Sequence, residues 1–165
     1  MDWILFFEKG IWLGLAALGF AILFNVPVRT LFFIVFLGAL GGLTKAAVLH
    51  FHISVVLASF AGASIIGMLS LFVGYRKHSP PMVFAIPAVI PMVPGVFTYK
   101  AMLGLIHLAS NNYTDQFGSI LAETVNNGLK ALFILLALAA GVALPLYITR
   151  RETIKEFMFE KRRRN

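Results

Sequence analysis

The stretch MVFAIPAVIPMVPGVFTYKAMLGLIH, residues 82–107, decides how this chain folds. It is apolar enough to enter a bilayer, yet Pro87, Pro91, Pro94 and Gly95 interrupt it. Each proline removes a backbone donor and clashes with the preceding turn of a helix. A wholly helical stretch of this length would also exceed a hydrocarbon core of about 30 Å. We therefore predict a membrane span that is broken at Pro91-Pro94-Gly95.

The residues after the break regain helix-forming character, so a second short helix should begin at Gly95. The start of such a helix exposes unpaired N–H groups and the positive end of the helix dipole. Membrane proteins use this arrangement to hold an anion near the midplane of the bilayer. Lys100 follows little more than one turn later. The alternative is an ordinary kinked span from which Lys100 extends to the membrane surface.

The composition predicts an integral membrane protein of the all-α polytopic class. Apolar residues make up 59% of the 165 residues, charged residues only 13%, and the mean hydropathy is +0.87. These values lie far from those of an average soluble domain. Half of the basic residues lie from Arg150 onward, so the net charge of +7 reports membrane topology and contact with lipid headgroups, not nucleic-acid binding.

We predict about five spans, arranged as one transmembrane domain, residues 1–149, and a basic cytoplasmic tail, residues 150–165. The basic loops favour an N-terminus outside and a C-terminus inside. A four-span arrangement, with residues 32–50 lying partly in the interface, is the main rival. The predicted spans are residues 3–24, 31–49, 53–75, 82–109 (the broken span) and 121–147, the last kinked at Pro145.

Small residues and a lysine follow one face of the second predicted span. Gly38, Gly41, Gly42 and Lys45 are spaced by three and four residues, so they share a helical stripe that should face protein. Because the helix ends about one turn after Lys45, near His50, this lysine could instead extend to the nearby surface. Both interpretations of Lys45 remain open from the sequence.

A polar face opens the last predicted span. Glu123, Asn127 and Lys130 fall on one side of the helix. The sequence does not decide between an ordinary interfacial polar stripe and the lining of an entrance to a transport path.

The distribution of charge points to anions. All seven acidic residues lie in the termini, the predicted outer loop or the beginning of the last span, whereas Lys45 and Lys100 lie at membrane depth. A positive interior suits carboxylate substrates. No nucleophile–base pair or ligand cluster is evident, so we predict no enzyme activity, no cofactor and no metal site. The candidate substrate-binding residues are Pro91, Pro94, Gly95, Thr98, Tyr99, Lys100, His107 and Lys45.

Two local patterns carry a family resemblance. Residues 19–27 read GFAILFNVP, and residues 89–95 read VIPMVPG, followed by Tyr99, Ala101 and Met102. Together they resemble the threonine/serine exporter (ThrE) family, and within it the YjjB-type small subunits of bacterial succinate exporters. The resemblance implies a bacterial inner-membrane exporter that supplies one half of the transporter. The other half would come from a larger YjjP-type membrane subunit.

The sequence therefore predicts a subunit of an inner-membrane exporter of small carboxylates, above all succinate. The expected partners are the larger membrane subunit, the anionic substrate, and anionic phospholipids at the basic tail. An exporter subunit for threonine or serine is one alternative, although its substrate ammonium would need a counter-charge that this chain lacks. A stabilising membrane subunit that does not itself contact substrate is another.

Overall fold

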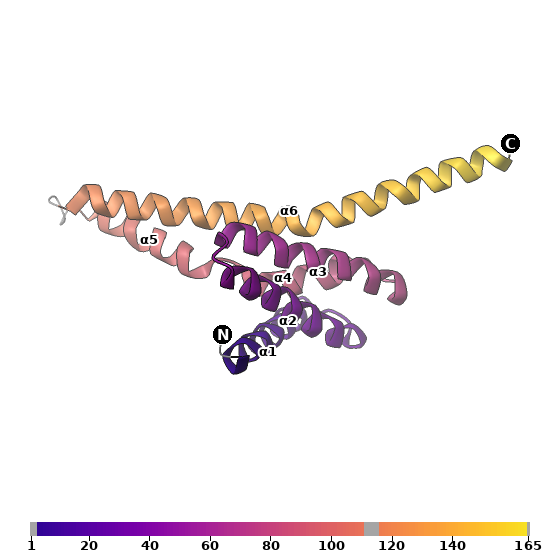
Figure 1. Cartoon of the computed structure of the whole chain (residues 1–165), viewed down its shortest axis with the longest axis horizontal. Coiled ribbons are helices and arrows are strands. Elements are labelled where there is room, and N and C mark those ends of the chain that lie inside the picture. The colour runs from indigo at the N-terminus through magenta and orange to yellow at the C-terminus, as the bar shows by residue number, and fades with distance from the viewer. Residues whose placement is uncertain (1–2, 111–115, 165) are drawn as a thin grey trace.

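The computed structural model describes residues 3–110 and 116–164, with side chains described as far as Thr149. Throughout these residues the regular structure is helical. Four helices are each long and apolar enough to cross a membrane, and a bent pair, Met82–Met92 with Gly95–Ala109, brings the number of candidate spans to five if it forms one span. This confirms the predicted all-α polytopic architecture (Figure 1). The elements are α1 (Trp3–Leu23), α2 (Val28–His50), α3 (Val55–Lys77), α4 (Met82–Val89), the 3-10 turn η1 (Ile90–Met92), α5 (Gly95–Ala109) and α6 (Phe117–Arg164).

Glycines bring α1 and α2 into close contact. A Cβ added to Gly42 would overlap the side chain of Leu13, and one added to Gly38 would lie 2.6 Å from the Cβ of Ala17. The two helices are joined by a tight turn in which Asn25 adopts a positive φ of 52°. Asparagine tolerates this left-handed conformation better than most residues.

The glycine stripe of α2 also packs against α3. A Cβ at Gly62 would lie 2.6 Å from the carbonyl oxygen of Gly41 and 2.6 Å from the terminal methyl of Met92. Gly38, Gly41 and Gly42 are all buried, which confirms that this stripe faces protein. Small residues permit such close approach of helix backbones in a membrane.

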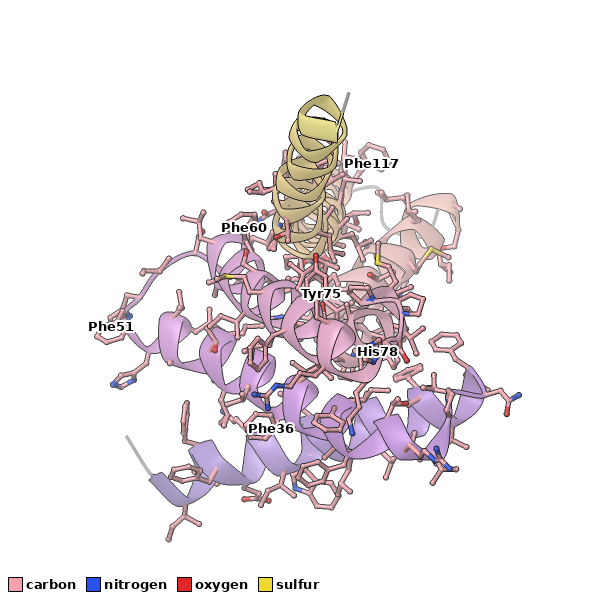
Figure 2. The ribbon with its side chains drawn as sticks, turned by 90° about the vertical axis from the view of Figure 1, so that its right-hand side faces the viewer. Phe36, Phe51, Phe60, Tyr75, His78 and Phe117 are labelled. Atoms are coloured by element: carbon pink, nitrogen blue, oxygen red, sulfur yellow. The ribbon has the colours of Figure 1, made fainter. Side chains whose placement is uncertain are left out.

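The central helix of the bundle is α4, which packs against α1, α2 and α3. Phe84 is fully buried, as are Ile34 of α2 and Ile66 of α3. Apolar side chains also cover the outside of the bundle, and Figure 2 shows Phe51 pointing away from the ribbon. An apolar exterior around a close-packed interior is expected of helices that lipid surrounds.

The last helix differs from the predicted fifth span. α6 begins at Phe117, earlier than expected, and continues as one helix through Pro145 and the basic segment to Arg164. Figure 1 shows that α6 changes direction along its length. Its part near Gly141 packs closely against Phe60 and Ala63 of α3.

The first half of α6 forms a hairpin with α5. Figure 1 shows this hairpin projecting beyond the end of α3. α5 packs mainly against α6, and none of its residues is buried. The predicted helix end at Asn111-Asn112 lies outside the described residues.

Candidate functional site

The break in the fourth span falls where the prolines predict it. η1 ends at Met92, Val93 is extended with φ −56° and ψ 138°, and α5 begins at Gly95. The two halves, Met82–Met92 and Gly95–Ala109, differ in direction by 54°. Pro87 lies inside α4 and does not end it.

The break lies near the middle of the membrane if α4 crosses it directly. The first half of the span runs from Met82 to Met92. At about 1.5 Å per residue this half covers about 16 Å, which is roughly half of a hydrocarbon core of about 30 Å. Transporters commonly place a substrate at this depth, where a helix is interrupted.

Lys45 lies at the break. Its Nζ donates a hydrogen bond of 3.1 Å to the carbonyl oxygen of Met92, 47 positions away in the chain. In the structure Lys45 therefore reaches toward the break of the fourth span. A cation is favourable at the C-terminal end of the α4–η1 segment, where carbonyl groups are unpaired. Because an ammonium group has three donors, two remain for an anion.

The beginning of α5 has free backbone donors. The N–H of Gly95 donates to the carbonyl of Val93 at 2.9 Å, whereas the N–H groups of Val96 and Phe97 donate to no described residue. Pro94 precedes the helix without a side-chain cap. The start of α5 thus keeps two donors and the positive end of a helix dipole.

The hydroxyl of Thr98 is already engaged. It donates to the carbonyl oxygen of Pro94 at 3.1 Å, within the first turn of α5. The sequence predicts that Thr98 contacts a carboxylate at the start of α5. In the structure its hydroxyl instead donates its hydrogen bond to a backbone carbonyl.

The other predicted residues of α5 lie on its surface. Tyr99 is 64% exposed, and Lys100 and His107 are also exposed. By their spacing of four and seven residues, Lys100, Gly104 and His107 share one helical face, and the sequence predicts that this face looks into the transport path. Gly104 instead packs directly against Thr124 of α6. The two polar residues therefore lie along the edge of the α5–α6 contact.

One polar residue near the break was not predicted as part of a site. Ser59 of α3 is fully buried, and its hydroxyl has no hydrogen-bond partner among the described residues. It lies one turn before Gly62, at which α3 contacts α2 and Met92. The sequence showed Ser59 only as one of several small residues on a packing face of α3.

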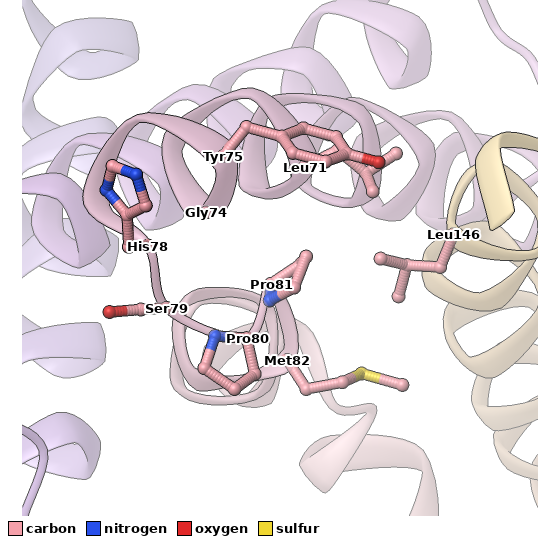
Figure 3. A pocket seen from close by; sticks show the side chains of 9 residues that line it. All are labelled: Leu71, Gly74, Tyr75, His78, Ser79, Pro80, Pro81, Met82 and Leu146. Atoms are coloured by element: carbon pink, nitrogen blue, oxygen red, sulfur yellow. The ribbon is translucent and has the colours of Figure 1, made fainter. Parts of the chain in front are cut away.

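Two clefts flank the contact between α3 and α6, away from the break. The larger, of about 710 Å³, lies between the end of α3, the turn at Pro80 and Pro81, and Leu146 (Figure 3). The smaller, of about 480 Å³, is lined by residues such as Phe72 and Pro145. Their walls are mostly apolar, and neither offers a lysine or arginine side chain to a carboxylate.

Comparison with known proteins decides the family. The sequence matches the threonine/serine exporter family, ThrE, over residues 9–148. This chain belongs to the threonine/serine exporter family. An uncharacterised protein of Haemophilus influenzae (strain ATCC 51907 / DSM 11121 / KW20 / Rd) is 34% identical over 132 residues, which are 80% of this chain and 43% of that protein. The match between this ThrE-family protein and that relative thus covers less than half of the relative's length. No solved structure matches this chain.

Proposed function

We propose that this ThrE-family protein is one half of an exporter of small carboxylates in the bacterial inner membrane, with succinate as its substrate. The break in the fourth span carries the proposal. There the uncapped start of α5 presents two free N–H groups, and Lys45 lies at the end of the preceding half-helix. Carboxylates are the groups that such donors and cations bind most strongly.

Lys100 is proposed as the lysine that recruits the carboxylate. It lies in the second turn of α5 and forms no ion pair with a described residue. A charged side chain in a membrane segment is costly unless it pairs or faces a polar path. An anion at the start of α5 would provide the missing counter-charge, with Tyr99 and His107 further along the same helix.

The second half of the exporter is proposed to be a larger membrane subunit of the YjjP type. α5 has no buried residue, and its apolar side chains, among them Met102 and Leu105, are more than half exposed. The relative from Haemophilus influenzae is more than twice as long as the matched region. We expect the additional membrane segments to pack against the α5–α6 hairpin. The N-terminus is proposed to lie outside and the basic tail inside, against anionic lipids.

Substitution of Lys100 by Met tests the proposal. Inverted membrane vesicles from the native host, with the chromosomal copy replaced, would report uptake of labelled succinate. We expect Lys100→Met to lower the initial rate at least tenfold, because the methionine keeps the apolar bulk of the side chain and loses its charge. Lys9→Met, a matched change near the beginning of α1, should keep the rate. An unchanged rate for Lys100→Met would remove this lysine from the site.

Export of threonine or serine is the second candidate, because the family takes its name from these substrates. Their carboxylate could use the same donors, but their ammonium needs an acceptor. Vesicles that accumulate labelled threonine and not succinate would favour this candidate and reject the dicarboxylate.

A further inference from the structure

A second lysine lies against the start of α5, although it belongs to α6. Nζ of Lys130 is 5.9 Å from the centre of the Phe97 ring, in the first turn of α5. A cation beside the N-terminal end of a helix is unfavourable, because the helix dipole is positive there. Neither Lys130 nor Lys100 forms an ion pair with a described residue. The ammonium groups of Lys100 and Lys130 and the uncapped start of α5 therefore have no negatively charged partner among the described residues.

The register of the hairpin places these groups on one edge. Gly104 packs against Thr124, and Gly128 lies opposite Ala101, so α5 and α6 run antiparallel. With about 3.6 residues per turn, Lys100 lies to one side of Gly104. Asn127 and Lys130 are rotated from Thr124 in the same direction as Lys100 is from Gly104. In antiparallel helices, residues rotated in the same direction from the contact lie at the same edge of it. Lys100 of α5 and Asn127 and Lys130 of α6 therefore share one edge of the hairpin.

The opposite edge of the same hairpin is apolar. By the same helical spacing it carries Leu105 from α5 and Val125 and Leu132 from α6, all at least half exposed. Lipid can cover such an edge. It cannot satisfy the polar edge at hydrocarbon depth, where no water is present to pair with polar groups. The polar edge therefore faces a polar ligand, water or protein.

Asn127 supplies an independent sign of a ligand. The residue is only 8% exposed, and its side chain makes no hydrogen bond to a described residue. Unlike the hydroxyl of Ser59, its amide is not fully shielded, so these polar atoms are open to a ligand. The nearest acid along α6, Glu123, is about two turns from Lys130, or roughly 10 Å along the axis. A carboxylate between the two helices would accept from the Asn127 amide and neutralise Lys130.

We propose that Lys130 and Asn127 form a second carboxylate subsite beside Lys100 and the start of α5, which selects small dianions over monoanions and zwitterions. The inference rests on the proposed export of carboxylates and specifies its substrate class. One carboxylate binds at Lys100 and the free N–H groups of Val96 and Phe97. The other binds at Lys130 and Asn127. An amino acid would place its ammonium against a lysine.

The test compares one dianion with one monoanion. Uptake of labelled succinate and labelled propionate is measured over a range of concentrations in inverted vesicles of the native host. We expect Lys130→Gln to raise the half-saturation concentration of succinate at least tenfold and that of propionate less than threefold. Lys130→Arg should stay within threefold of the parent for both. An equal change for the two substrates, or none for succinate, would overturn the subsite.

A chemical rescue separates charge from folding. The chain has no cysteine, so Lys130→Cys introduces a single thiol. Modification with aminoethyl methanethiosulfonate restores a positive charge, whereas methyl methanethiosulfonate adds a neutral group to the same folded protein. Recovery of succinate uptake with the first reagent alone supports the subsite, and equal uptake after both overturns it. If the parent protein transports neither succinate nor propionate, the proposed function itself is wrong.

Discussion

The bundle of α1–α4 and the α5–α6 hairpin are built from the same apolar residue types but are buried to different extents. In the bundle, glycines such as Gly41 and Gly62 bring backbones into contact, and large side chains such as Phe84 are fully buried. In the hairpin, α5 buries none of its residues. The difference indicates that the bundle, together with the part of α6 that packs against α3, is the scaffold. We propose the hairpin as the surface at which a substrate and a partner bind.

Overpacking should affect the bundle far more than the open end of the hairpin at Gly118. Gly62→Leu would force a side chain against the backbone of Gly41 and should destabilise the protein by about 3 kcal/mol or more. Gly118 of the hairpin has no atom within 4 Å of an added Cβ, so Gly118→Leu should cost almost nothing. Thermal unfolding in detergent measures both variants. Similar losses of stability would remove the distinction between the two regions.

The hydrogen bond from Lys45 of α2 to Met92 holds the bundle side of the break that leads to the hairpin. Lys45→Met should cost about 1.5–3 kcal/mol, the usual contribution of a hydrogen bond to a charged group. Denaturant unfolding measures the loss. Hydrogen exchange should also quicken at the residues around Val93, while exchange in α1 stays unchanged. Parent-like stability and exchange would show that the bond does not hold the break.

The proposed partner should be found on the hairpin. We expect a photoreactive group attached at Met102→Cys to cross-link to the larger subunit in native membranes at least ten times more than one at Ile11→Cys. Both residues are more than half exposed, but Ile11 belongs to the bundle. The measurement is the yield of the cross-linked pair, identified by antibodies to both subunits. A higher yield from Ile11→Cys would place the partner on the bundle.

The smallest effect is expected at Thr98. Its hydroxyl donates to the carbonyl oxygen of Pro94, so Thr98→Val should lower stability by about 0.5–1.5 kcal/mol. Succinate uptake should change less than twofold, because this hydroxyl is not free to bind a carboxylate. A loss of uptake comparable to that of Lys100→Met, in a protein of normal stability, would return Thr98 to the substrate site.

The break could be predicted from the sequence because prolines act on their own backbone. Pro94 and Gly95 lie together in the chain, and their effect needs no distant residue. The close packing of Gly38, Gly41 and Gly42 followed from their spacing in the same way. The full length of α6 did not, because its start at Phe117 and its continuation beyond residue 147 lie outside the apolar pattern on which the predicted span depends.

The arrangement of the site depended on contacts that no local pattern contains. Lys45 meets Met92 across 47 positions, and the register of Gly104 against Thr124 sets which edge Lys100 occupies. Asn127 and Lys130 were recognised as one polar face of α6. Their position beside the start of α5 depends on how α5 and α6 pack against each other, which the sequence pattern does not show.

Whether an anion is held at the start of α5 can be measured by protection of a thiol placed there. Val96→Cys introduces a single thiol in the first turn of α5 and keeps Lys100, and Leu105→Cys introduces one on the apolar edge of the same helix. Reaction with the anionic reagent sulfonatoethyl methanethiosulfonate is followed in native vesicles with and without succinate. We predict that the reagent modifies Cys at position 96 and that succinate slows this reaction at least fivefold, while position 105 shows neither effect. A rate at position 96 that succinate leaves unchanged would show that no anion is held there.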